Sequence, residues 1–173
     1  MWIMLEVIIV AILGILAYVA TKPDSFKIVR SLEIKAAPET IAPHLSNFHD
    51  WQAWSPWEGI DADLVRSYDG PSSGKGAVYG WKGQKTGEGR MEILDASPEH
   101  IDIQLDFIKP FKANNLAVFK LKPQADKTLV VWSMSGKNAY LNKLFSLFMD
   151  MDAMIGKDFE KGLNQLKTLV ETA

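Results

Sequence analysis

The sequence predicts an α+β domain in which an antiparallel sheet packs against one long C-terminal helix, with an apolar helix in front of the domain. Three patterns carry this prediction. Short alternating runs of apolar and polar residues, separated by turn signals, fill much of the chain between residues 26 and 134. Apolar residues then recur at helical spacing from about Tyr140 to Val170. The first 20 residues are almost entirely apolar.

The composition sets the broad class of the protein. A chain of 173 residues indicates one domain with a short additional segment. A net charge of -2 gives no sign of the basic surface that nucleic-acid binding requires. The absence of cysteine excludes disulfide bonds and cysteine nucleophiles. Because His44, His49 and His100 show no metal-binding spacing, we predict no metal site and no cofactor.

The N-terminal segment predicts a transmembrane anchor, residues 1–21, joined by a linker, residues 22–25, to a ligand-binding domain, residues 26–173. Only Glu6 interrupts the apolar run. About 20 helical residues extend roughly 30 Å, which is the thickness of a bilayer's hydrocarbon core. We therefore expect a single-pass membrane protein. A buried helix and a cleaved signal peptide are the alternatives.

The charges around the apolar run bear on those alternatives. A signal peptide needs a basic start, and no Lys or Arg precedes the run. Lys22, Lys27 and Arg30 follow the run. The positive-inside rule then places the domain in the cytoplasm.

The body of the chain contains one early strand, a short helical region and six later strands. The strand-like runs are residues 26–34, 62–68, 77–81, 87–93, 101–107, 116–121 and 129–134. Pro38 suits the first position of a helix, and Pro43 keeps that helix short. Short loops join the six later strands, so these strands must be antiparallel. The terminal helix is the long amphipathic element that could cover the sheet's apolar face.

Four segments resemble a known family. They are SLEIKAAPETI at 31–41, WQAWSPW at 51–57, PSSGKGAVYGW at 71–81 and FMDMDAMIGKDFEKGL at 148–163. Their wording and order resemble the polyketide cyclase/dehydrase-like branch of the START-like (SRPBCC, helix-grip) superfamily over roughly residues 25–171. An N-terminal membrane segment also fits this branch.

The resemblance implies a seven-stranded antiparallel sheet that grips the C-terminal helix around a hydrophobic cavity. It does not imply one reaction, because the superfamily includes lipid carriers, hormone receptors, cyclases and chaperone-associated modules. We predict that the domain binds a small hydrophobic or amphipathic, lipid-like molecule without catalysis. The candidate cavity walls are apolar and aromatic side chains, namely Trp54, Tyr79, Trp81, Phe107, Trp132, Phe148, Met151 and Ile155.

Two other functions remain open from the sequence. A cyclase or dehydratase would need an ionisable group inside the cavity, and the candidates are Arg30, Glu88, Asp106 and Asp158. A membrane-tethered interaction module would use the WQAWSPW segment as an exposed docking surface. The tryptophans of that segment could equally form a cavity wall or a cap that plugs the end of the sheet.

Overall fold

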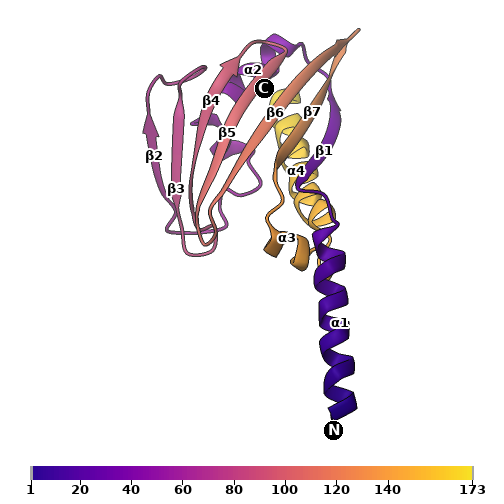
Figure 1. The fold of residues 1–173 in the computed structure, drawn as a ribbon. Coiled ribbons are helices and arrows are strands. Elements are labelled where there is room, and N and C mark those ends of the chain that lie inside the picture. The colour runs from indigo at the N-terminus through magenta and orange to yellow at the C-terminus, as the bar shows by residue number, and fades with distance from the viewer. Residues whose placement is uncertain (1, 173) are drawn as a thin grey trace.

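A computed structural model describes residues 2–172, apart from the side chains of Ile3 and Leu141 (Figure 1). The elements in chain order are α1 (Trp2–Ala20), β1 (Ser25–Ile34), α2 (Pro38–Ser46), the 3₁₀ helix η1 (Asp50–Ala53), β2 (Val65–Asp69), β3 (Val78–Lys82), β4 (Glu88–Ala96), β5 (His100–Lys109), β6 (Ala113–Gln124), β7 (Lys127–Lys137), α3 (Tyr140–Phe145) and α4 (Met151–Glu171).

The seven strands form one antiparallel sheet in the order β1-β7-β6-β5-β4-β3-β2. The first strand pairs with the last, so the sheet edges are β1 and β2. Figure 1 shows α4 lying against the sheet next to β1 and β7. The predicted seven-stranded antiparallel sheet with a C-terminal helix is therefore confirmed, and it fits the helix-grip fold.

The core lies between the concave face of the sheet and α4. Phe159, Leu163 and Leu166 of α4 are fully or almost fully buried. The Phe159 ring stacks on Trp132 of β7, with the ring centroids 4.0 Å apart and an interplanar angle of 3°. Burying each such side chain contributes about 1.5–3 kcal/mol to folding. The alternation of apolar residues in the strands thus supplies one wall of the core and the helical periodicity supplies the other.

Arg30 fastens the first turns of α4 to β1. Its guanidinium forms ion pairs with Asp152 at 2.8 Å and with Glu160 at 2.9 Å. The guanidinium lies so close to Gly156 that a Cβ at that position would overlap it. The glycine that interrupts the helical pattern therefore makes room for a cation arriving from the neighbouring strand.

The continuous terminal helix expected over residues 140–170 is wrong, because the chain breaks it into α3 and α4. Ser146 ends α3 and its hydroxyl donates to the carbonyl of Lys143 at 2.7 Å. Asp150 then caps α4 by accepting a hydrogen bond from the amide of Ala153 at 3.0 Å. An N-cap satisfies a backbone donor that a helix start otherwise leaves free, so Asp150 favours a new start at Met151.

The predicted transmembrane span is wrong. In the part of the chain that the structure describes, no helix is both long enough and apolar enough to cross a bilayer. The 19 residues of α1 extend about 28 Å, and Glu6 leaves a shorter unbroken apolar run. The single-pass membrane localisation is therefore wrong as well. The orientation of the domain inferred from Lys22, Lys27 and Arg30 depended on that span and is withdrawn.

The helix α1 extends away from the domain (Figure 1). Near its end Val19 is fully buried, and the Tyr140 hydroxyl of α3 donates to the carbonyl of Leu16 at 2.9 Å. The residues after α1 are also held in place. The Asp24 side chain pairs with Lys143, and the backbone carbonyl of Asp24 accepts a hydrogen bond from the amide of Asn138.

Candidate ligand-binding site

The tryptophan-rich segment after α2 is anchored to that helix. The indole N–H of Trp51 donates to the carbonyl of Leu45, and that of Trp54 donates to the carbonyl of His44, each at 3.1 Å. The ring of Trp54 is fully buried and that of Trp51 is 4 % exposed. These two side chains cap the core, because their polar N–H groups use carbonyls at the end of α2 and their rings fill the space beneath it.

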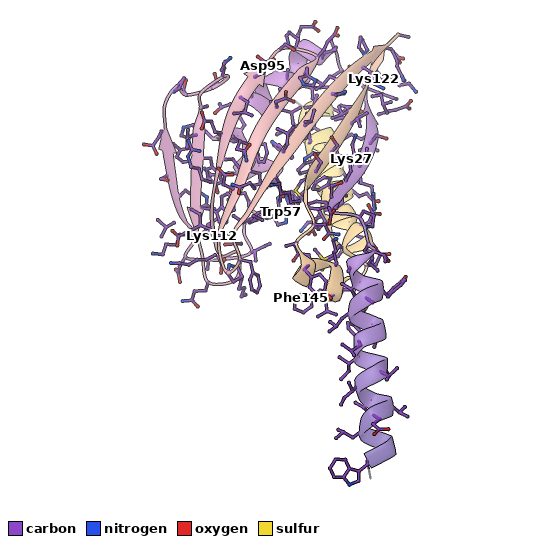
Figure 2. The ribbon with its side chains drawn as sticks, viewed as in Figure 1. Lys27, Trp57, Asp95, Lys112, Lys122 and Phe145 are labelled. Carbon is purple, nitrogen blue, oxygen red and sulfur yellow. The ribbon has the colours of Figure 1, made fainter. Side chains whose placement is uncertain are left out.

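Trp57 lies further from α2 and is only half-buried. Its ring meets Trp132 edge-on at 5.6 Å and Phe159 at 6.1 Å. Figure 2 shows Trp57 between the sheet and the C-terminal helix. The third tryptophan of the segment therefore marks the boundary of the solid core.

Beyond this boundary lies a cavity of about 290 Å³ between the segment of residues 51–64 and strands β3 and β4. Four aromatic side chains line it, Trp51, Trp57, Tyr79 and Trp81. The other lining residues are Ser55, Glu58, Ile60, Leu64, Lys85, Thr86 and Met91. Binding sites for small molecules are mostly apolar with a few polar groups that orient the ligand, and this cavity has that character.

The main polar residue of the cavity wall, Glu58, forms a hydrogen-bonded bridge to two strands. Glu58 follows the tryptophan segment, Arg66 lies on β2 and Tyr79 on β3. One carboxylate oxygen of Glu58, Oε2, accepts hydrogen bonds from Nε of Arg66, at 3.0 Å, and from its Nη2. The other oxygen, Oε1, accepts from the Tyr79 hydroxyl at 2.8 Å. The bridge ties the loop to the edge of the sheet.

The electrostatics of the bridge keep its donors protonated. Burial, and next the hydrogen bond to Glu58, raise the pKa of the Tyr79 phenol well above its ordinary value. The hydrogen bond with Glu58 also raises the pKa of the Arg66 guanidinium. Tyr79 therefore remains a hydrogen-bond donor throughout the physiological pH range.

A second carboxylate holds the turn between β3 and β4 at the rim of the cavity. Asp61 accepts hydrogen bonds from the Thr86 hydroxyl at 2.7 Å, from the Thr86 amide at 2.8 Å and from the Lys85 amide at 3.0 Å. These hydrogen bonds lower the pKa of Asp61, and the bond from the Thr86 hydroxyl has the largest effect. Asp61 is buried behind the rim and does not line the cavity.

The profile of one protein family, described as polyketide cyclase/dehydrase and lipid transport, matches residues 25–171. The chain belongs to this family. Membership confirms the superfamily that the four sequence segments indicated, and the family's description suggests a hydrophobic ligand-binding fold. No curated protein sequence matches the chain.

Solved structures show the same fold at low sequence identity. Protein CV1439 from Chromobacterium violaceum is 16 % identical, with a TM-score of 0.58 over 87 % of this chain and 99 % of its own. The Aha1 dimer from Colwellia psychrerythraea is 18 % identical, with a TM-score of 0.60 over 84 % and 96 %. Protein MLL2253 from Mesorhizobium loti is 15 % identical, with a TM-score of 0.61 over 86 % and 98 %. These likenesses concern the fold alone.

The structure distributes the sequence-predicted wall residues of this family member over three places. Tyr79 and Trp81 line the cavity, whereas Phe107 packs edge-on against Trp81 at 5.8 Å and does not itself line the cavity. Trp54 and Trp132 are buried in the core, where their rings lie 5.7 Å apart, and they do not line the cavity.

The remaining three predicted residues, Phe148, Met151 and Ile155, line a separate, more polar groove. This groove has a volume of about 550 Å³ and lies between β1, α3 and the start of α4. The sequence pattern placed all eight residues around one cavity because they share an apolar character and an expected inner face. Phe148 lies in the break between α3 and α4, and Met151 and Ile155 lie in the first turns of α4 after it.

The four ionisable candidates for catalysis do not line the aromatic cavity. Arg30 pairs with α4 as described above. Glu88 pairs with Lys109 at 3.0 Å. Asp106 accepts hydrogen bonds from the side chains of Gln104 and Asn114. Asp158 is half-buried on α4. Within residues 2–172, no cluster of three or more acidic or histidine side chains could hold a metal ion.

Of the three residues that form the bridge, Tyr79 was predicted as a cavity-wall residue, whereas Glu58 and Arg66 were not predicted. Glu58 directly follows the tryptophan segment, which was a weak signal, since a charged residue beside aromatic residues is usually exposed. Tyr79 lies 21 residues further along the chain. No local pattern indicates that the two side chains meet, because their contact depends on how the loop folds back over the sheet.

Proposed function

We propose that this protein binds a small hydrophobic or amphipathic molecule in the aromatic cavity, without catalysis. The observation that carries the proposal is a cavity of about 290 Å³ whose walls are largely aromatic and aliphatic. Ligand pockets span roughly 300–1,000 Å³, so this one suits a compact ring or a short chain rather than a complete two-chain lipid. The family's description, which includes lipid transport, supports a ligand of apolar character.

Burial of apolar surface would drive the binding. Removing about 300 Å² of apolar ligand surface from water favours the complex by roughly 7 kcal/mol before the costs of association. The rigid hydrogen bonds of Trp51 and Trp54 and the Asp61 bonds to the β3–β4 turn support a cavity whose walls need little reordering on binding. A preformed site loses less of this free energy to ordering.

The test is ligand recovery combined with a matched pair of tryptophan variants. We expect mass spectrometry of solvent extracts from the purified full chain to show a bound apolar molecule. Titration calorimetry with 1-octanol as the probe should give an affinity that falls at least tenfold in Trp81→Leu, because this ring lines the cavity. The control is Trp2→Leu, whose ring is 78 % exposed on α1. Equal losses in both variants, or no bound molecule and no octanol binding, would contradict the proposal.

A cyclase or dehydratase activity is the second candidate, and Glu58 is the observation that favours it. A carboxylate that lines an apolar cavity can exchange a proton with a bound substrate. Its hydrogen bonds to Arg66 and Tyr79 equally suit a structural role. Under the catalytic alternative, Glu58→Gln would abolish turnover of a polyketide-like substrate while leaving its binding measurable.

The interaction-module alternative receives no support from the tryptophan segment. It requires an exposed aromatic patch. The rings of Trp51 and Trp54 are instead buried beneath α2, and only Trp57 is partly accessible.

A further inference from the structure

The polar end of the aromatic cavity has a definite hydrogen-bonding character. Glu58 lines the cavity, and its side chain is only 10 % exposed. A carboxylate offers about four acceptor positions, two on each oxygen. Arg66 uses Oε2 twice, and Tyr79 uses Oε1 once. Oε1 therefore keeps an acceptor position, and so does the Tyr79 hydroxyl oxygen, which donates its one hydrogen to Glu58.

The strong donors around this end are already engaged or lie outside the cavity, apart from the indole N–H of Trp57, which lines the cavity and has no hydrogen-bond partner among the described residues. Arg66 does not line the cavity. It directs Nε and Nη2 to Glu58 and Nη1 to the carbonyl of Leu64. The Thr86 hydroxyl donates to Asp61, and the Trp81 indole N–H donates to the carbonyl of Thr86 at 3.3 Å. The part of the wall formed by Glu58 and Tyr79 therefore presents acceptors to a ligand.

Two other polar side chains line the cavity and act differently. The Ser55 hydroxyl is buried and can both donate and accept, so it does not discriminate between ligand groups. The Lys85 side chain is exposed at the rim, where water screens its ammonium group. A ligand carboxylate could meet Lys85 only by leaving its polar end in solvent.

From this arrangement we infer that the cavity selects an amphipathic ligand with a hydrogen-bond donor, a hydroxyl or an ammonium group, directed at Oε1 of Glu58. The inference rests on the proposed binding function and names the chemical class of its ligand. A donor would complete the coordination of a buried carboxylate, and hydrogen bonds to charged groups are about twice as strong as neutral ones. A ligand carboxylate at the same place would have no proton to donate and would face a like charge.

Arg66 makes a neutral donor suitable for this position. Its guanidinium already balances the charge of Glu58 through two hydrogen bonds to Oε2. A ligand hydroxyl therefore does not need to bring a charge into the cavity. Glu58 is by this account a specificity-determining residue, with Arg66 as the positioning residue behind it.

The experiment compares ligands that share one apolar body. Calorimetric titrations of the full chain would use 1-octanol, its methyl ether, which accepts but cannot donate, and octanoate, which is an anion. We expect 1-octanol to bind about tenfold more tightly than the ether and more tightly than octanoate, because one charge-assisted hydrogen bond distinguishes the alcohol. Octylammonium should share the alcohol's advantage over octanoate.

Two variants change the acceptor in opposite directions. Tyr79→Phe removes the donor that now occupies Oε1 and leaves the Glu58–Arg66 pair in place, so the alcohol-to-ether affinity ratio should rise. Glu58→Gln replaces the charged acceptor, so the same ratio should fall towards one. Lys122→Gln is the control. That lysine is exposed, does not line the cavity and lies at the end of the sheet opposite α1 (Figure 2).

The outcomes separate this inference from the proposed function. Binding of alcohol and ether with equal affinity would overturn the inference and leave the apolar binding function standing. A preference for octanoate would also overturn it and would assign the dominant contact to Lys85. Absence of binding for every probe would overturn both. The wild-type ligand series decides these cases even if Glu58→Gln fails to fold.

Discussion

The aromatic core and the aromatic cavity are built from the same residue types, yet one is solid and the other is hollow. In the core, Trp132 stacks between Phe119, at 4.9 Å, and Phe159, at 4.0 Å. In the cavity, Tyr79 and Trp81 stand on β3 with centroids 6.1 Å apart and border a space of about 290 Å³. The difference lies in what covers the sheet.

Over β1 and β7, the helix α4 brings Phe159 into direct contact with the sheet. Over β3 and β4, the covering element is the loop that follows the tryptophan segment, held by Glu58 and Asp61. A helix presents a continuous row of side chains, whereas a loop fixed by a few polar bonds leaves gaps between them. Whether an aromatic residue on this sheet fills the core or lines the cavity thus depends on whether a helix or a loop packs over it.

The largest expected effect comes from removing a ring of the solid core. Trp132→Ala should lower the free energy of unfolding by about 3–5 kcal/mol, because it opens a void between Phe119 and Phe159. Trp81→Ala should cost only about 1 kcal/mol, because that ring already borders an open space. Urea unfolding followed by circular dichroism would measure both. Similar losses in the two variants would remove the distinction between core and cavity.

A smaller effect on stability should follow from adding a Cβ at Gly156, where α4 leaves space for the Arg30 guanidinium. Alanine favours a helix over glycine by about 1 kcal/mol. Gly156→Ala should nevertheless destabilise the protein, since its Cβ would displace the Arg30 guanidinium from Asp152 and Glu160. In an Arg30→Ala background the same change should become stabilising. Unfolding midpoints of the four proteins would show this reversal of sign, and stabilisation in both backgrounds would contradict it.

The smallest expected effect is a pH-dependent change in stability from Asp61, which holds the turn between β3 and β4. Because its hydrogen bonds lower the pKa of Asp61 in the folded state, Asp61 stabilises the fold fully above its unfolded pKa of about 3.9. This stabilisation is lost as the pH falls through the lower folded value. Asp61→Asn should therefore lower the urea midpoint at pH 7, and the gap to the wild type should narrow at about pH 3. A gap that stays constant between these pH values would assign the effect to another cause.

The fold followed from local patterns to a large extent. The alternation in runs such as Ile101, Ile103, Leu105 and Phe107 predicts a strand with one buried side, and the structure has β5 there. Short loops then require antiparallel neighbours, and the resemblance to the family supplies the seven-stranded sheet and the cover by the C-terminal helix. The pairing of β2 to β7 joins strands that are adjacent in the chain, whereas the pairing of β1 with β7 joins the two ends of the domain.

Two local predictions failed where length or capping mattered more than periodicity. The helical pattern continues through residues 146–150, but the Asp150 cap starts a new helix there. The apolar run at the N-terminus forms the expected helix, yet α1 does not combine the length and the apolar character that a membrane span requires. A pattern of apolar residues does not by itself state where a helix begins.

The amino-acid sequence alone thus determined an antiparallel sheet with a C-terminal helix, a supply of aromatic residues for its concave face and membership of the polyketide cyclase/dehydrase and lipid transport family. Only the tertiary structure decided which tryptophans fill the core and which face a cavity. It alone brought Glu58, Arg66 and Tyr79 together, from a loop and two strands. The physical reason is that alternation and helical periodicity report burial on one element, while a cavity and its polar groups arise from the mismatch between two elements that meet across the core.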